Sequence, residues 1–120
     1  MTTVLVVDDE PLMRSLMSQV LQQEGFSVFT ADGGREALSV FRSHRSEIGL
    51  LISDIVMPEM DGPSLAMKLQ AECPGLPVLL MSGYCDGSQL STRFEFLAKP
   101  FSMPDLLARV RTLAQKRSAA

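Results

Sequence analysis

The sequence predicts an α/β fold in which a doubly wound, five-stranded parallel sheet carries helices on both faces. Short apolar runs alternate with longer segments in which apolar residues recur at helical spacing. The runs are continuous and rich in β-branched residues, as is typical of strands buried on both faces. The alternation fills all 120 residues without a repeat or linker, so we expect a single domain over residues 1–120.

The first predicted strand covers residues 4–7, a continuous apolar run too short for a helix. Pro11 then suits the first turn of a helix, and Gly25 suits its C-terminal end. The apolar residues of that helix recur at i, i+4 and i+8 and are expected to form one stripe: Leu12, Met13, Leu16, Met17, Val20 and Leu21.

The middle of the chain continues the alternation. We predict a second strand over residues 28–31 and a helix after Gly34 with Ala37, Leu38 and Phe41 on one face. A third strand over residues 49–53 ends at Asp54. Asp61 is a good N-cap for the next helix, and Gly62 suits a tight turn into it.

The last third contains a strand, a weak helix, a strand and a helix. Residues 77–81 form the fourth predicted strand, and residues 86–91 form a short fourth helix, the weakest of the predicted elements. Residues 94–98 form the fifth strand, and Ser102 is a plausible N-cap for the final helix. With right-handed crossovers, five such units match a flavodoxin-like sheet of strand order 2-1-3-4-5.

Polar residues follow the ends of four predicted strands. Asp8 and Asp9 follow the first strand, Asp54 the third, Ser82 the fourth and Lys99 the fifth. In such sheets ligands bind beyond the carboxyl ends of the strands, where the strand order reverses. Each of these residues alone is typical of a turn, a cap or a solvated surface, but together they predict an anion or metal site.

Three carboxylates at one edge repel one another unless a positive charge compensates. Oxygen ligands with open positions suit Mg²⁺, which also shares phosphate oxygens. With Lys99 and Ser82 it would neutralise a phosphoryl group on a carboxylate, which is aspartyl phosphate chemistry. The residues by themselves do not select Asp54 over Asp8 or Asp9 as the acceptor.

The chain resembles the receiver domain of bacterial two-component response regulators along its whole length. The resemblance lies in the segments VLVVDDE (4–10), GREAL (34–38), DIVMPEMDG (54–62), MSG (81–83) and KPF (99–101). It implies a phosphoacceptor domain that is not a conventional enzyme but catalyses its own Mg²⁺-dependent phosphorylation and dephosphorylation. It also implies that Mn²⁺ substitutes for Mg²⁺.

The same resemblance assigns a role to each matching residue. Asp54 matches the phosphoacceptor, and the metal ligands match Asp8, Asp9, Asp54 and the backbone carbonyl of Val56. Lys99 matches the phosphate-pairing lysine. Ser82 matches the switch hydroxyl and Phe96 the switch aromatic residue. The Lys99–Pro100 peptide is expected to be cis.

The expected partner is a histidine kinase or a histidine phosphotransfer protein. The interval from Ser82 to Lys99 is shorter than is usual in the family, in the region of the fourth helix. Together with the sequences around Ser82 and Lys99, this resembles receivers attached to hybrid histidine kinases. The net charge of −3 and the lack of a basic run argue against direct nucleic-acid binding. No apolar run is long enough to span a membrane, and the cytoplasm is the expected location.

Three other functions fit the residues less well. A phosphatase or small kinase is disfavoured because no glycine-rich phosphate loop occurs and no second Asp stands two residues after Asp54. A flavodoxin-like module that binds flavin or phosphate is disfavoured because the acidic edge would repel an anionic cofactor. A phosphorylation-independent scaffold is disfavoured because every expected catalytic position is filled.

Overall fold

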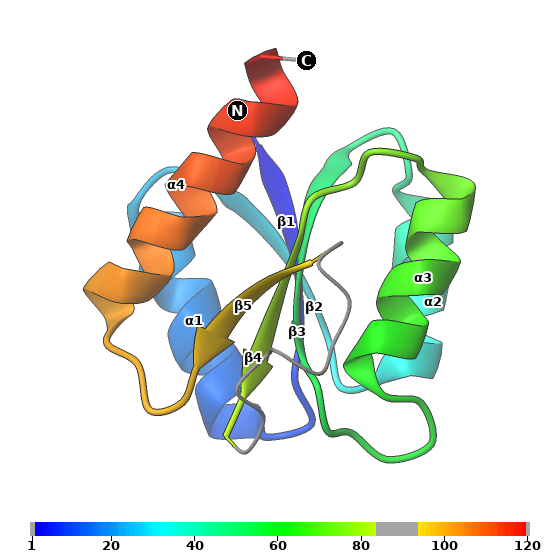
Figure 1. The fold of residues 1–120 in the computed structure, drawn as a ribbon, viewed down its shortest axis with the longest axis horizontal. Helices are drawn as coiled ribbons and strands as arrows, with labels where there is room; N and C mark the ends of the chain where they lie inside the picture. The colour runs from blue at the N-terminus through cyan, green and yellow to red at the C-terminus, as the bar shows by residue number, and fades with distance from the viewer. Residues whose placement is uncertain (1, 84–93, 120) are drawn as a thin grey trace.

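The computed structural model describes residues 2–83 and 94–119. A parallel sheet lies at the centre, with one pair of helices packed on each face (Figure 1). The amino ends of the strands and the N-terminus lie at the top of the view, and the carboxyl ends of the strands point downward. The predicted α/β class is therefore confirmed.

The sheet contains the five predicted strands in the predicted order, β2-β1-β3-β4-β5, and all neighbouring pairs are parallel. The observed bounds differ from the predicted ones by a residue at most ends: β1 (Thr3–Val7), β2 (Ser27–Ala31), β3 (Ile48–Asp54), β4 (Val78–Ser82) and β5 (Glu95–Ala98). The strand order reverses next to β1 and β3, so these strands frame the predicted site.

Helices α1 (Pro11–Gln23) and α4 (Met103–Ala119) cover one face, whereas α2 (Gly34–Ser43) and α3 (Gly62–Glu72) cover the other (Figure 1). The label α4 belongs to the C-terminal helix, because the short helix predicted over residues 86–91 lies outside the described residues. Within the described parts of the chain, no helix has both the length and the apolar character needed to cross a bilayer.

Alternation along the strands divides the interior into two cores. Val4 and Val6 pack with α1 and α4, whereas Leu5 and Val7 pack with α2 and α3. All four side chains have no exposed surface. Because successive strand residues point to opposite faces, a continuous apolar strand is what a sheet covered on both sides requires.

The stripe predicted on α1 is only partly buried. Met17 and Leu21 have no exposed surface, and Met13 packs against the core. Leu12 is 80% exposed and Leu16 44% exposed. These two residues lie about 100° around the helix from the row formed by Met13, Met17 and Leu21. The buried face of α1 is therefore narrower than the predicted stripe of six apolar residues.

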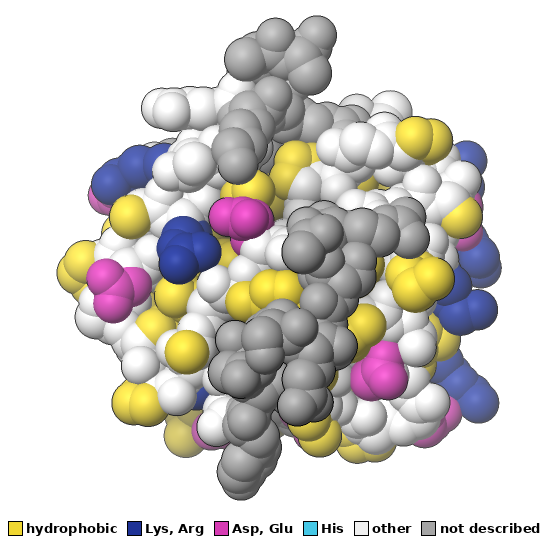
Figure 2. Space-filling model, in the orientation of Figure 1, with side chains coloured by type: hydrophobic (Ala, Val, Ile, Leu, Met, Phe, Trp, Pro, Cys, Tyr) yellow, Lys and Arg dark blue, Asp and Glu magenta, His cyan; other side chains and the backbone are white. Residues whose placement is uncertain are grey.

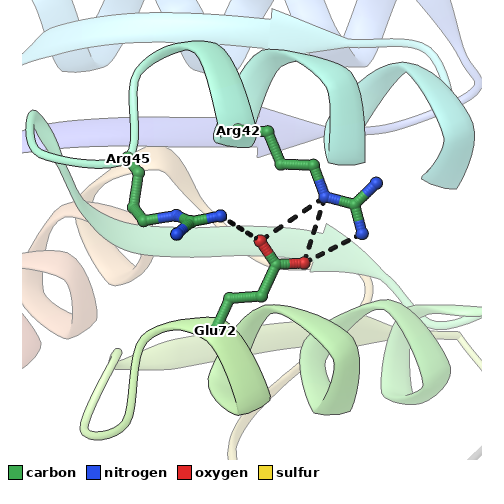
Figure 3. A network of polar contacts seen from close by, with 3 residues as sticks. All are labelled: Arg42, Arg45 and Glu72. Atoms are coloured by element: carbon green, nitrogen blue, oxygen red, sulfur yellow. Dashed lines mark hydrogen bonds and ion pairs between the residues drawn. The ribbon is translucent and has the colours of Figure 1, made fainter.

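Ion pairs join the helices at the amino edge of the sheet. Glu72, near the end of α3, receives hydrogen bonds from Arg42 at 2.9 Å and 3.1 Å and from Arg45 at 2.5 Å (Figure 3). The hydrogen bond and charge of Arg42 lower the pKa of the Glu72 carboxyl. Arg111 of α4 pairs with Glu24 at the end of α1, so on each face of the sheet an ion pair joins the two helices of that layer.

Charge is mixed over the surface. On the face shown in Figure 2, acidic and basic side chains are interspersed with apolar ones, and its described residues form no broad basic patch. This distribution agrees with the net charge of −3.

Candidate functional site

Residues at the carboxyl ends of four strands meet at one edge of the sheet. Asp8 directly follows β1, Asp54 ends β3, Ser82 ends β4 and Lys99 directly follows β5. The carboxyl ends of these strands lie at the lower edge of the sheet in Figure 1. Their side chains come from segments far apart in the chain, and only the parallel topology places them together.

Asp54 and Lys99 form a direct ion pair. The Nζ atom of Lys99 donates a hydrogen bond of 3.0 Å to Oδ2 of Asp54, and the two side chains are 26% and 14% exposed respectively. Partial burial alone would lower the pKa of Lys99, but the hydrogen bond to Asp54 and the negative charges around it raise the pKa above its usual value. Lys99 is therefore charged at neutral pH.

Three carboxylates converge beside this pair. One oxygen from each of Asp8, Asp9 and Asp54 lies within 4.8 Å of the others. Asp8 is fully buried, Asp54 is half-buried and Asp9 is exposed. Like charges this close destabilise one another in the absence of a compensating cation.

All but one of the polar groups of Asp8 form hydrogen bonds with described residues. Its amide donates to the carbonyl of Ala31 at 3.2 Å, and its Oδ1 accepts from the amide of Glu10 at 2.9 Å. Its Oδ2 is buried and has no hydrogen-bond partner among the described residues. Burial raises the pKa of the Asp8 carboxyl, and the charge of Asp54 adds to the increase.

Arg14 is part of this site, although the sequence analysis did not select it. Its Nη1 donates a hydrogen bond of 2.7 Å to the backbone carbonyl of Asp8. Arg14 lies in the first turns of α1, where the helix dipole disfavours a cation. No residue pattern signals this contact, because the acceptor is a backbone atom.

The donor set fits a small divalent cation. The acid cluster supplies hard carboxylate oxygens, which Mg²⁺ prefers. The partnerless Oδ2 of Asp8 is the kind of buried oxygen that a cation or its bound water satisfies, because an unpaired buried acceptor is costly. Among the described residues, three carboxylates against the Lys99 ammonium and the Arg14 guanidinium still leave an excess of negative charge.

Close backbone contacts fix the end of β3. The amide of Ile55 donates to the carbonyl of Met81 at 2.9 Å, and the amide of Gly62 donates to the carbonyl of Ile55 at 2.9 Å. A Cβ atom on Gly62 would collide with the backbone carbonyl oxygen of Asp54. Only glycine therefore lets the start of α3 approach so closely, which confirms the tight turn predicted there.

A hollow of about 310 Å³ opens beside the ion pair of Asp54 and Lys99. It is lined by Asp54, Val56, Gly83 and Lys99. The Val56 side chain is 68% exposed, and Ser82 is 6% exposed at the end of β4. The amide of Lys99 donates to the carbonyl of Ser82 at 2.7 Å, which holds these two strand ends together.

Phe96 lies beside this cluster rather than within it. It sits inside β5 opposite Leu80 of β4, and its half-buried side chain packs against the core under α2 and α3. Arg109 of α4 donates to its backbone carbonyl at 3.1 Å. The Lys99–Pro100 peptide that follows is cis, as the resemblance implied.

Comparison with known proteins identifies the class. Residues 4–111 match the family model of the response regulator receiver domain, so this chain belongs to that family. Its members act in bacterial two-component systems and are not conventional enzymes. The suspected resemblance is therefore confirmed over nearly the whole chain.

Two curated relatives show the contexts in which similar chains occur. The chain is 36% identical over 120 residues to the sensor kinase CckA of Brucella abortus, and the aligned region covers 96% of this chain and 13% of that protein. It is 35% identical over 124 residues to the probable transcriptional regulatory protein TcrX of Mycobacterium tuberculosis, covering 95% of this chain and 50% of that protein. The chain thus spans half or less of these relatives.

Solved structures agree in fold. The receiver domain of the hybrid histidine kinase CckA superposes with a TM-score of 0.82 at 36% identity and covers 92% of this chain and 97% of that one. TrrA of Thermotoga maritima, solved in complex with Mg²⁺-BeF, gives a TM-score of 0.84 at 34% identity and covers 94% and 99% of the two chains.

Proposed function

We propose that this chain accepts a phosphoryl group from phosphohistidine onto Asp54 in a Mg²⁺-dependent reaction. The observation that carries this proposal is the 3.0 Å pair between Lys99 Nζ and Asp54 Oδ2 beside two further carboxylates. The Asp54 carboxylate borders a hollow in which a phosphoryl donor could approach it. The Lys99 ammonium bound to Asp54 is suited to neutralise the negative charge of the phosphorylated product.

The transfer exchanges one bond to phosphorus for another. A carboxylate oxygen of Asp54 forms a bond to phosphorus as the bond to the imidazole nitrogen breaks, and that nitrogen keeps the electron pair. The Lys99 ammonium and the Ser82 hydroxyl then bind oxygens of the transferred group. Such reactions depend mainly on positioning and charge stabilisation, which these strand-end groups are suited to provide.

Asp9, Asp54 and the carbonyl of Val56 would hold Mg²⁺, and Asp8 would act partly through bound water. When bound, the ion would neutralise the incoming phosphoryl oxygens. The partnerless Oδ2 of Asp8 supports this assignment, as does the Mg²⁺-BeF complex of the similar TrrA. Mn²⁺ also takes oxygen ligands in octahedral geometry, and we propose that it substitutes.

We further propose that the product signals through Ser82 and Phe96. A phosphoryl group adds a charge of about −1.5 to −2 at neutral pH. The Ser82 hydroxyl would move toward that charge, and Phe96 would turn inward behind it. Since Phe96 already packs at the margin of a core, a small movement there would change the surface around β5.

The partner would be a histidine kinase or a histidine phosphotransfer protein in the cytoplasm. Similarity to the CckA receiver supports an origin in, or a likeness to, a hybrid histidine kinase. We propose no direct contact with nucleic acid for this domain. The scaffold and flavodoxin-like alternatives are not favoured, because an acidic edge with a paired lysine suits transient phosphate rather than an anionic cofactor.

The test is incorporation of phosphate from acetyl phosphate in the presence of Mg²⁺. The wild type should be labelled at one site, and Asp54→Asn should not be labelled. Asp32→Asn is the matched control, since Asp32 also follows a strand, β2, but is exposed outside the acid cluster. Full labelling of Asp54→Asn would show that the acceptor is another residue.

A further inference from the structure

The structure points to a positioning role for Arg14 in the metal site, and this inference rests on the proposed function. We propose that Arg14, through its 2.7 Å hydrogen bond to the Asp8 carbonyl, holds the Asp8–Asp9 peptide in the orientation that lets both acids serve one Mg²⁺ ion. Arg14 would not itself contact the metal or the phosphoryl group.

Asp8 is anchored at its backbone and at one carboxylate oxygen. Its amide is held by Ala31 and its Oδ1 by Glu10. The carbonyl is the remaining backbone group, and the Arg14 guanidinium is its partner. With these three groups fixed, the buried Oδ2 of Asp8 has no partner among the described residues and is left available to a cation or its water.

The carbonyl matters because it belongs to the peptide that joins the two acids. A peptide unit is planar, so the direction of the Asp8 carbonyl also sets the positions of the Asp9 amide and Cα. Asp9 is exposed, whereas Asp8 is fully buried and anchored at three of its polar groups. The place of Asp9 in the cluster therefore depends on the orientation of this peptide.

The contact acts through geometry more than through charge. Arg14 donates to the backbone carbonyl of Asp8 and not to its carboxylate, and the charges that most shift the pKa of that carboxyl are those of Asp54, Lys99 and Asp9. Hydrogen bonds donated by a guanidinium are strong, and Arg14 is partly buried. A cation near the helix N-terminus opposes the dipole, so this hydrogen bond compensates for an unfavourable position.

Outer groups that orient metal ligands typically affect metal affinity by 10–100-fold. Arg14→Met removes the donor and keeps a long side chain. We expect its Mg²⁺ dissociation constant, measured by calorimetric titration, to rise about 10-fold. Arg14→Lys keeps one donor and should show a smaller rise.

The labelling reaction supplies a second measurement. The Mg²⁺ concentration that gives the half-maximal labelling rate should rise in parallel with the dissociation constant in Arg14→Met, while the rate at saturating Mg²⁺ stays near that of the wild type. Arg45→Met is the control, because Arg45 is a surface arginine that pairs with Glu72 at the opposite edge of the sheet. Its Mg²⁺ affinity should match the wild type.

Unchanged Mg²⁺ affinity in Arg14→Met, or a lower maximal rate with unchanged affinity, would overturn this inference. If Arg14→Met does not fold, as judged by circular dichroism in EDTA, Arg14→Lys decides the question by the same criteria. Failure of the proposed function looks different. In that case the wild type itself would neither bind Mg²⁺ nor incorporate phosphate.

Discussion

At the scale of single residues, Asp8 carries the clearest electrostatic conflict. Burial raises the pKa of its carboxyl, and the charges of Asp54 and Asp9 add to that increase. The folded protein without metal thus binds a proton at Asp8 more tightly than the unfolded chain does. By linkage, ionising Asp8 removes stability. The loss is absent below the unfolded pKa of 3.8 and complete above the raised folded value.

Asp8→Asn should therefore stabilise the protein in EDTA. The amide removes a charge and places a donor beside the remaining carboxylates. We expect the free energy of unfolding to rise by about 1 kcal/mol at neutral pH. The gain over wild type should shrink as the pH falls toward 3.8. Denaturant unfolding at several pH values measures this, and a gain that grows toward low pH would contradict the assignment.

Lys99 supplies the positive charge that pairs with Asp54. Lys99→Ala removes the ammonium bound to Asp54 and should slow labelling by acetyl phosphate on the order of 10²-fold, as removal of a charge-stabilising donor does. Lys68→Ala changes an exposed lysine on α3 and should leave the rate unchanged. Equal rates for wild type and Lys99→Ala would exclude Lys99 from the reaction.

At the scale of elements, local patterns predicted most of the structure. The strands can be predicted from the sequence because a sheet covered on both faces needs continuous apolar runs. The Asp61 side chain caps α3 by accepting from the Ser64 amide at 2.8 Å, as its position predicted. The exposure of Leu12 and Leu16 cannot be predicted from the sequence. Periodicity gives the direction of the apolar face of a helix but not the width of the surface that packs against it.

Gly62 at the start of α3 gives a prediction at this scale. Gly62→Ala places a Cβ against the Asp54 carbonyl, so backbone must move, and we expect a loss of about 1–3 kcal/mol in unfolding free energy. Gly49→Ala in β3 is the control, because its new Cβ would meet Thr2 at an ordinary 3.6 Å. A Gly62→Ala protein as stable as Gly49→Ala would contradict the close approach.

At the scale of the whole molecule, topology converts strand ends into a site. Parallel strands place their carboxyl ends at one edge, so Asp54 and Lys99, separated by 45 positions, could be predicted to meet there. The contact between Arg14 and the Asp8 carbonyl could not be predicted, since a side chain that reaches a backbone atom leaves no residue pattern. The choice of Asp54 as acceptor came from family resemblance.

Mg²⁺ should stabilise the whole domain. A ligand that binds only the folded state adds about 1.4 kcal/mol at a concentration ten times its dissociation constant. The melting temperature should therefore rise when Mg²⁺ replaces EDTA. Asp9→Asn removes one oxygen donor of the acid cluster and should show a smaller rise. An equal rise in that variant would place the ion elsewhere.

The most direct test of the central claim is to locate the phosphoryl group. After treatment with acetyl phosphate and Mg²⁺, borohydride reduces an aspartyl phosphate to homoserine, which peptide mass spectrometry can map. We expect homoserine at position 54 in the wild type. Homoserine at position 8 or 9 instead, or labelled protein with no homoserine, would contradict the claim.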